Sequence, residues 1–96
     1  MGAAVARNET ITGMQIRAAR GFLAWDRRDL AKNSVVTLYT IERLETGAEI
    51  SGAAMTKGLA AVKATLEAEG IEFINEAEVL GVLLHPKKRK ARAKGK

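Results

Sequence analysis

The short segment 37–43 contains side chains that could read the edges of DNA base pairs. Arg43 can offer two parallel N–H donors to O6 and N7 of guanine, and Glu42 can accept a hydrogen bond from N4 of cytosine. Tyr39 can stack on a sugar or bond a phosphate. The same residue types also form ordinary solvated helix faces, and that alternative stays open. If the segment is a helix lying in a groove, the predicted base contacts are Thr37, Leu38, Tyr39, Glu42 and Arg43.

Basic and hydroxyl side chains elsewhere could hold the phosphate backbone, which dominates affinity for nucleic acid. The net charge is +5, but the seven basic residues beyond Pro86 contribute +7 and leave residues 1–86 at −2. Residues 12–47 carry +2 and residues 48–86 carry −4. This polarity turns the N-terminal half and the tail toward a polyanion, although such a tail can also serve only solubility. The predicted phosphate contacts are Arg17, Arg27, Arg28, Thr40, Thr46, Lys87, Lys88, Arg89 and Lys90.

Enzymatic chemistry has few residues to work with. The absence of cysteine excludes disulfides, thiolate metal sites and cysteine nucleophiles. His85 is the only histidine, and its neighbour Pro86 offers no partner for a metal or a catalytic triad. Neither a glycine-rich phosphate loop nor a nucleophile elbow is present. We therefore expect a protein that is not an enzyme and uses no metal and no cofactor.

The N-terminal segment lacks the apolar core of a signal peptide. No apolar run approaches the ~20 residues needed to cross a bilayer. We therefore expect a cytoplasmic protein with no membrane partner.

Three helices must position the polar segment. Thr12 and Gln15 have the spacing of a capping box, which predicts a helix over 13–25. Asp26 can cap a second helix over 27–33, and Thr37 can cap a third over 38–45 that Gly47 closes. The aromatic side chains of Phe22 and Trp25 are expected in the core or at its edge.

The C-terminal half is predicted to contain one long helix and a hairpin. Ser51 can cap a helix that ends at Gly70, with apolar residues spaced four, three and four apart. The β-rich runs 71–74 and 79–84 surround a turn at 75–78, and Pro86 ends the second run. The fold class is therefore mainly α: four helices, a short C-terminal β-hairpin and a disordered basic tail. The expected divisions are a flexible segment 1–10, a domain 11–86 and the tail 87–96.

Two short helices joined by a tight turn form a helix-turn-helix unit, in which each helix contributes small or branched apolar residues to one core. Leu30 and Ala31 occupy the inward positions of the first helix, and Ile41 and Leu44 those of the second. Val36 lies at the exit of the turn. A larger residue than Ala31 would force the helices apart. The spacing therefore predicts a helix-turn-helix whose second helix is 38–45.

The sequence resembles the Xre family of bacterial helix-turn-helix regulators, relatives of the lambda-type repressors and Cro. The resemblance covers residues 11–74, about two-thirds of the chain, and is closest to a small single-domain alphaproteobacterial branch. It lies in ITGMQIRAAR at 11–20, Trp25, DLA at 29–31, TIERLE at 40–45, Gly47 and LEAEGIEFI at 66–74. It implies a transcriptional regulator, with repression as the expected action, that works at the bacterial nucleoid and binds double-stranded operator DNA.

Two positions depart from the family pattern. The turn position usually held by glycine is Val35, and positive φ at a β-branched residue would cost about 1 to 2 kcal/mol. The turn is therefore either strained or differently shaped. The usual Ser-Gln at the start of the second helix is Asp26-Arg27, where Arg27 could replace the lost backbone contact with a charged one.

The hairpin suggests how two copies could associate. Its second strand has an apolar edge, and two strands alone are marginally stable. We expect a homodimer through Val79, Leu80, Val82 and Leu84, which would read two half-sites about one helical turn apart. Two alternatives remain: a protein-interaction module such as an antitoxin or adaptor, and a sequence-indifferent DNA binder that works through its tail.

Overall fold

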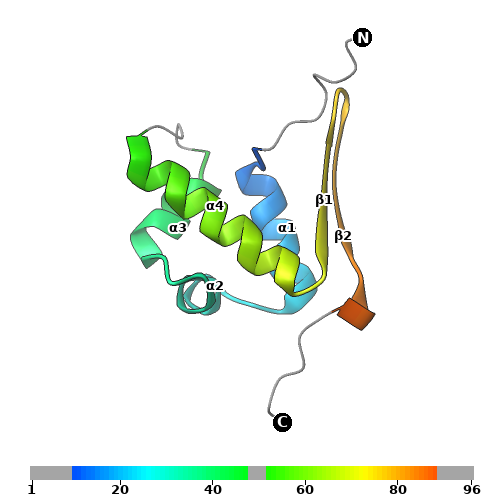
Figure 1. The fold of residues 1–96 in the computed structure, drawn as a ribbon, viewed down its shortest axis with the longest axis horizontal. Helices are drawn as coiled ribbons and strands as arrows, with labels where there is room; N and C mark the ends of the chain where they lie inside the picture. The colour runs from blue at the N-terminus through cyan, green and yellow to red at the C-terminus, as the bar shows by residue number, and fades with distance from the viewer. Residues whose placement is uncertain (1–9, 48–51, 89–96) are drawn as a thin grey trace.

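The computed structural model describes residues 10–47 and 52–88. It is mainly helical, with an antiparallel hairpin after the helices, as predicted (Figure 1). Its elements are α1 (Gly13–Leu23), α2 (Arg27–Ser34), α3 (Leu38–Glu45), α4 (Gly52–Ala68), β1 (Ile71–Glu76), β2 (Val79–Leu84) and the 3-10 turn η2 (Pro86–Lys88). The boundary expected at residue 87 falls inside η2, so Lys87 and Lys88 belong to a short turn.

Local capping explains where the first helices begin and end. Thr12 and Gln15 form the predicted capping box at the start of α1. Asp26 and Asp29 form a second box at the start of α2, and the Thr37 side chain accepts a hydrogen bond from Thr40 N at the start of α3. The helix α1 ends at Leu23, earlier than predicted, because Ala24 takes a left-handed conformation with φ 59°.

The core lies between the four helices and the inner face of the hairpin. Ile16, Leu30, Ile41 and Leu66 are among its fully buried side chains, one from each helix. Trp25 is buried in this core, as predicted. Phe22 is not: half of its surface is exposed, because α1 turns it to the flank of the buried stripe rather than into it.

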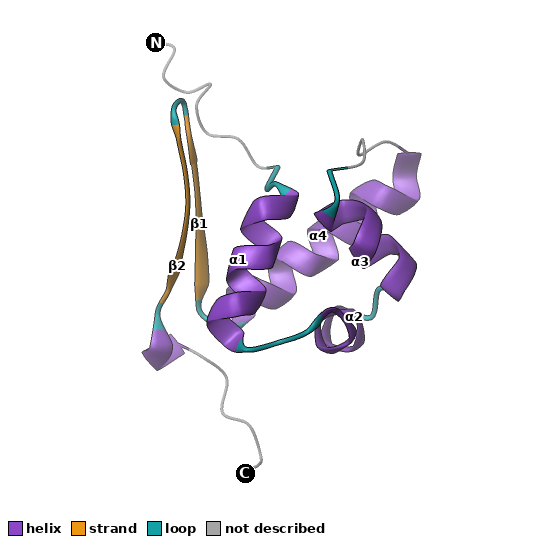
Figure 2. Ribbon diagram, turned by 180° about the vertical axis from the view of Figure 1, so that it is seen from behind, coloured by secondary structure: helices purple, strands orange, loops and turns teal. Residues whose placement is uncertain are grey.

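The hairpin is longer on its first strand than predicted. Strand β1 runs to Glu76 and pairs with β2 from Ile71↔Leu84 to Glu76↔Val79, so the turn shortens to Ala77 and Glu78. The hairpin runs alongside α1 at one end of the molecule, and α3 lies at the opposite end (Figures 1 and 2). Within the described ranges, no helix has the length and apolar character needed to span a membrane.

Candidate nucleic-acid interface

The turn between α2 and α3 has the compact form of a helix-turn-helix. Val35 caps α2 in a left-handed conformation with φ 58°, and Val36 N donates to Ala31 O at 3.1 Å. The structure therefore decides between the two expectations for Val35: the turn keeps a left-handed shape and places a β-branched residue there. Val35 is 90% exposed, so no side-chain packing offsets this strain.

The helix α3 divides its side chains between the core and the surface. Ile41 and Leu44 are buried, whereas Glu42, Arg43 and Tyr39 are exposed. The Arg43 guanidinium lies 5.7 Å from the centre of the Tyr39 ring, a cation–π distance. An exposed guanidinium supported by an aromatic ring can present its donors to an acceptor outside the protein.

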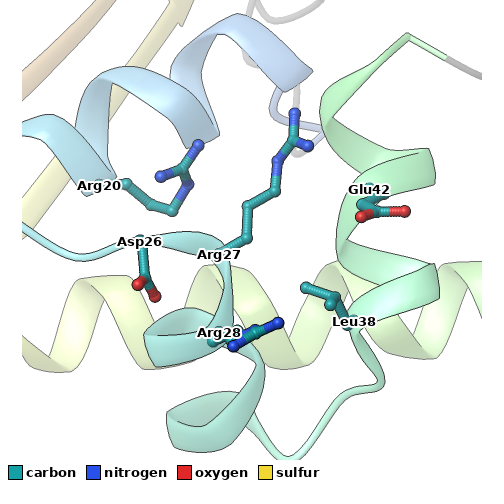
Figure 3. Close-up of a pocket in the computed structure, with 6 residues that line it drawn as sticks. All are labelled: Arg20, Asp26, Arg27, Arg28, Leu38 and Glu42. Carbon is teal, nitrogen blue, oxygen red and sulfur yellow. The ribbon is translucent and has the colours of Figure 1, made fainter.

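A hollow of about 470 Å³ separates the start of α2 from α3 (Figure 3). Leu38 and Glu42 line it from α3, and Arg27 and Arg28 line it from α2. Arg20 and Asp26 complete the lining. The lining therefore combines three guanidinium groups with two carboxylates, and the hollow borders the exposed face of α3.

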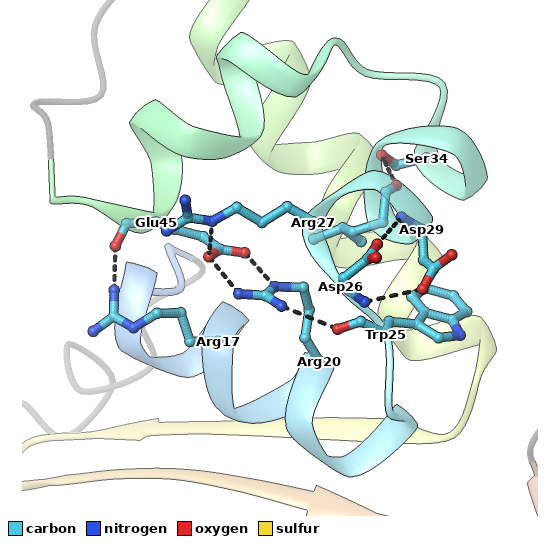
Figure 4. Close-up of polar contacts among 9 residues, drawn as sticks. Arg17, Arg20, Trp25, Asp26, Arg27, Asp29, Ser34 and Glu45 are labelled. Atoms are coloured by element: carbon cyan, nitrogen blue, oxygen red, sulfur yellow. Dashed lines mark hydrogen bonds and ion pairs between the residues drawn. The ribbon is translucent and has the colours of Figure 1, made fainter.

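A buried carboxylate holds α3 against α1 and α2 (Figure 4). Glu45 is 1% exposed and accepts from Arg20 Nε at 2.6 Å and from Arg20 Nη2 at 2.8 Å. It also accepts from Arg27 Nε at 2.9 Å. The Arg17 guanidinium donates to the backbone carbonyl of Glu45, and Arg20 Nη1 donates to Trp25 O at 3.0 Å. One side chain therefore joins the three elements that set the orientation of α3.

The charges in this cluster shift each other's ionisation. Burial tends to raise the pKa of Glu45, but hydrogen bonds and charge from Arg20 and Arg27 outweigh it and hold the pKa below its usual value. The hydrogen bonds to Glu45 raise the pKa of Arg20. At the start of α2, the pKa of Asp26 is lowered mainly by the backbone N–H of Asp29. Glu45 therefore stays ionised although it is buried.

Two glycines let other helices approach α3 closely. A Cβ at Gly13 would lie 2.5 Å from Glu45 O and 2.7 Å from Leu44 O, so only glycine fits where α1 meets the end of α3. A Cβ at Gly58 on α4 would lie 2.9 Å from Thr40 Cγ2. These two contacts fix both the beginning and the end of α3.

The structure places the predicted phosphate contacts in different surroundings. Arg28 is exposed beside the hollow, and Thr46 is exposed after α3. Arg17 and Arg27 are not simply free for phosphate, because the carbonyl and the carboxylate of Glu45 engage them. Thr40 turns its methyl toward Gly58, and its hydroxyl accepts a hydrogen bond from the Thr37 hydroxyl at 3.1 Å.

The two predicted tail contacts that the structure describes lie away from α3. Lys87 and Lys88 are exposed in η2, at the hairpin end of the molecule (Figure 1). Arg89 and Lys90 fall outside the described residues. A contact between Lys87 or Lys88 and DNA bound at α3 would therefore have to reach around the molecule.

The predicted dimer residues differ in exposure. Val79 and Leu80 are exposed, Val79 on the outer face of the hairpin and Leu80 on the same face as Val82 and Leu84. Val82 and Leu84 instead pack against the core, so their side chains are only partly accessible. Leu83, which was not singled out from the sequence, is exposed on the outer face. Strand alternation in β2 is the signal that could have found it.

Sequence reasoning also missed the buried roles of Glu45 and Gln15. Glu45 continues the inward spacing of Ile41 and Leu44, which was the available signal. For Gln15 the capping box was recognised, but not the contacts that its amide makes with the hairpin.

His85 Nε2 lies 2.7 Å from Glu72 Oε1, a pairing between β1 and the residue that follows β2, which the sequence did not predict. In the part of the chain that the structure describes, no group of three His, Asp or Glu residues could hold a metal.

No protein-family model matches this chain, and no curated protein matches it significantly.

Proposed function

We propose that this protein is a sequence-specific DNA-binding transcriptional regulator that inserts α3 into the major groove. The observation that carries the proposal is the α2–turn–α3 unit, in which Ile41 and Leu44 anchor one side of α3 while Tyr39, Glu42 and Arg43 stay exposed on the other. An α-helix fits the major groove, and exposed Arg and Glu side chains are suited to base edges there.

The residues around α3 divide into two roles. Arg43 and Glu42 are the base-reading side chains, with Thr37 and Leu38 at the leading end of the helix. Arg28, beside the hollow, takes a phosphate that flanks the groove, because phosphate contacts set orientation without reading sequence. The buried Glu45 cluster keeps α3 in a fixed orientation relative to both.

The resemblance to the Xre family supports this assignment, because that family uses the same unit to bind operators. The left-handed turn at Val35 also supports it, since Val35 takes the positive φ for which glycine is the usual residue. Repression, rather than activation, is the simplest outcome for a small domain that covers its operator.

Fluorescence anisotropy tests the proposal with the full chain at ~150 mM salt. DNA from upstream of the protein's own gene is compared with scrambled DNA of the same composition. We expect a preference of about 10³-fold or more for the upstream fragment, the range of specific binding. Equal affinity for both fragments would contradict sequence-specific binding at this site.

Two substitutions at Arg43 separate base reading from charge. We expect Arg43→Ala to weaken binding to the preferred DNA by about 10- to 100-fold and to leave binding to scrambled DNA nearly unchanged. Arg43→Lys keeps the charge but loses the bidentate fork, so it should lose most of the preference as well. Lys63→Ala on α4 is the control for loss of one positive charge. Equal losses on both DNAs would assign Arg43 to phosphate binding.

Neutralising the basic residues 89–96 with glutamine tests the alternative of a tail-driven binder. Under our proposal, this variant keeps its sequence preference and shows a smaller dependence on salt. If binding instead disappears and no preference existed before, DNA contact belongs to the tail. The folded domain would then be a protein-interaction module.

A further inference from the structure

The exposed side of α1 carries an apolar stripe. Met14, Ala18 and Phe22 follow each other at four-residue spacing and are all exposed, so they form a line along the helix. The stripe is flanked by Gln15, whose side chain binds the hairpin, and faces away from the buried Ile16 and Leu23. The line therefore lies on the flank of α1 that is next to β2.

Strand β2 adds further exposed apolar side chains. Leu80 lies on the face of the hairpin that carries α1, Val79 and Leu83 lie on the outer face, and all three are about half exposed. Strand β1 is the only partner of β2 within the described ranges, so the other edge of β2 has no strand beside it there. Alternate residues of an edge strand direct their N–H and C=O groups away from its neighbour, ready to pair with another strand.

The side chain of Gln15 joins the apolar stripe of α1 to strand β2. Its Nε2 donates to Gly81 O at 3.0 Å and to Ile74 O at 3.2 Å, which seats α1 on the inner face of the hairpin. Both views of the ribbon show α1 between the hairpin and α3, running alongside the hairpin (Figures 1 and 2). The surface formed by Met14, Ala18, Phe22 and the free edge of β2 is called the α1–β2 surface below.

We propose that the α1–β2 surface binds a second copy of the chain. The two β2 strands pair antiparallel about a two-fold axis and form a four-stranded sheet, while the two α1 stripes pack against each other above it. The small side chain of Ala18 at the middle of each stripe permits close approach of the helices. This inference rests on the proposed function, because a two-fold dimer supplies two copies of α3 for two half-sites.

Symmetry restricts the register of the pairing. In an antiparallel pair, residues that lie opposite each other point to the same side of the sheet. If both α1 helices also lie on one side of the sheet, each β2 residue and its copy point to the same side, so the two-fold axis must pass a β2 residue that lies opposite its own copy. With Val82 at this centre, Leu80 lies opposite the partner's Leu84 and Leu83 opposite the partner's Gly81. The half-exposed Leu80 and Leu83 each gain a neighbour from the second copy in this register. The large Leu83 side chain also lies opposite a glycine, which leaves room for it.

Charge complementarity favours this register. The hairpin tip carries the exposed acidic residues Glu76 and Glu78, and the opposite end carries the exposed Lys87 and Lys88. Antiparallel pairing centred on Val82 brings the tip of each copy to the basic end of the other. The apolar strip is then bordered at both ends by opposite charges, which is the usual arrangement of an interface core and rim.

Sedimentation velocity of the full chain without DNA tests the association itself. We expect a monomer–dimer equilibrium at micromolar concentration. Ala18→Glu should weaken dimerisation by about 100-fold or more, because it brings two like charges together at the two-fold axis. Ala60→Glu, at an exposed alanine of α4, is the matched control and should leave dimerisation unchanged. Circular dichroism and thermal unfolding verify that both variants are folded.

A charge exchange tests the register. Within one copy, Glu78 and Lys87 lie at opposite ends of β2, about 20 Å apart by strand length, so they cannot contact each other. Lys87→Glu should weaken dimerisation about 5-fold, and Glu78→Lys combined with Lys87→Glu should restore it. Such a rescue requires that the tip of one copy meet the basic end of the other.

Three outcomes overturn the proposal: a chain that remains monomeric throughout, a dimer that Ala18→Glu leaves intact, and a double exchange that fails to rescue. The DNA titration is independent of all three. A monomer that still prefers the upstream fragment would leave the proposed function standing and remove only the dimer interface. A dimer without any DNA preference would leave the dimer interface standing and contradict the proposed function.

Discussion

The two ends of this molecule are each attached to α1 by one buried polar side chain, and the two side chains differ in charge. At the α3 end, Glu45 is ionised and bound by Arg20 and Arg27. At the hairpin end, Gln15 is neutral, 3% exposed, and bound to Ile74 O, Gly81 O and Asn75 Oδ1.

The comparison indicates a different use for each end. A buried charge needs all its partners, so it fixes one orientation of α3 and makes that orientation sensitive to pH. A buried amide satisfies backbone and side-chain groups without charge, so the contact of Gln15 with the hairpin does not depend on an ionised group. The rigid, charged end carries the residues proposed to read DNA. The neutral end carries the apolar surface proposed to bind a second copy.

Glu45→Gln should give the largest effect. It removes the counter-charge of the mostly buried Arg20, and breaking a buried pair from one side costs about 3 to 5 kcal/mol. Urea unfolding monitored by circular dichroism measures the loss. Glu42→Gln, at an exposed glutamate of the same helix, is the control and should change stability by less than about 0.5 kcal/mol. Similar losses in the two variants would contradict the role given to Glu45.

Acid should produce part of the same loss reversibly. Because the folded protein lowers the pKa of Glu45, its stabilising effect is complete above the ordinary carboxyl pKa. This effect disappears as the pH falls through the lowered value. Asp26, whose pKa is also lowered, adds to the trend. Unfolding free energies between neutral pH and pH ~2 should therefore fall less steeply in Glu45→Gln than in the parent chain. Parallel curves would assign the acid sensitivity to other groups.

Gln15→Ala should come next and act on the hairpin end. It removes half of the capping box and the amide contacts to β1 and β2, which together stabilise by about 1 to 3 kcal/mol. Amide hydrogen exchange should accelerate in β1 and β2 more than in α3. Asn33→Ala, which removes an exposed amide that donates to Asp29 O at 2.8 Å, is the control. Uniform acceleration across the chain would mean that Gln15 does not anchor the hairpin specifically.

Val35→Gly should have the smallest effect and the opposite sign. Val35 and Ala24 are the non-glycine residues with positive φ among those described, and both are exposed. We expect Val35→Gly to stabilise the domain by about 1 kcal/mol, because relief of β-branched strain exceeds the added freedom of the unfolded chain. Ala24→Gly should gain less, since alanine is not β-branched. Thermal unfolding compares the two variants, and a loss in Val35→Gly would show that the turn is not strained.

Local signals in the sequence predicted most of the elements. Capping residues such as Thr12, Asp26 and Thr37 marked the start of each of the first three helices, because they act on backbone groups only a few residues away. The ends of elements were less accurate. The helix α1 stops before Trp25 and β1 extends to Glu76, since a left-handed Ala24 and cross-strand pairing with Val79 decide these limits.

For the candidate site, the sequence by itself determined that α3 buries Ile41 and Leu44 and exposes Tyr39, Glu42 and Arg43, because helical periodicity follows from the order of residues alone. Only the tertiary structure decided that Arg17 and Arg27 bind Glu45, that Thr40 faces Gly58, and that Val82 faces the core. Each of these contacts joins segments far apart in the chain. Their partners are set by how the helices and the hairpin pack, which no local pattern encodes.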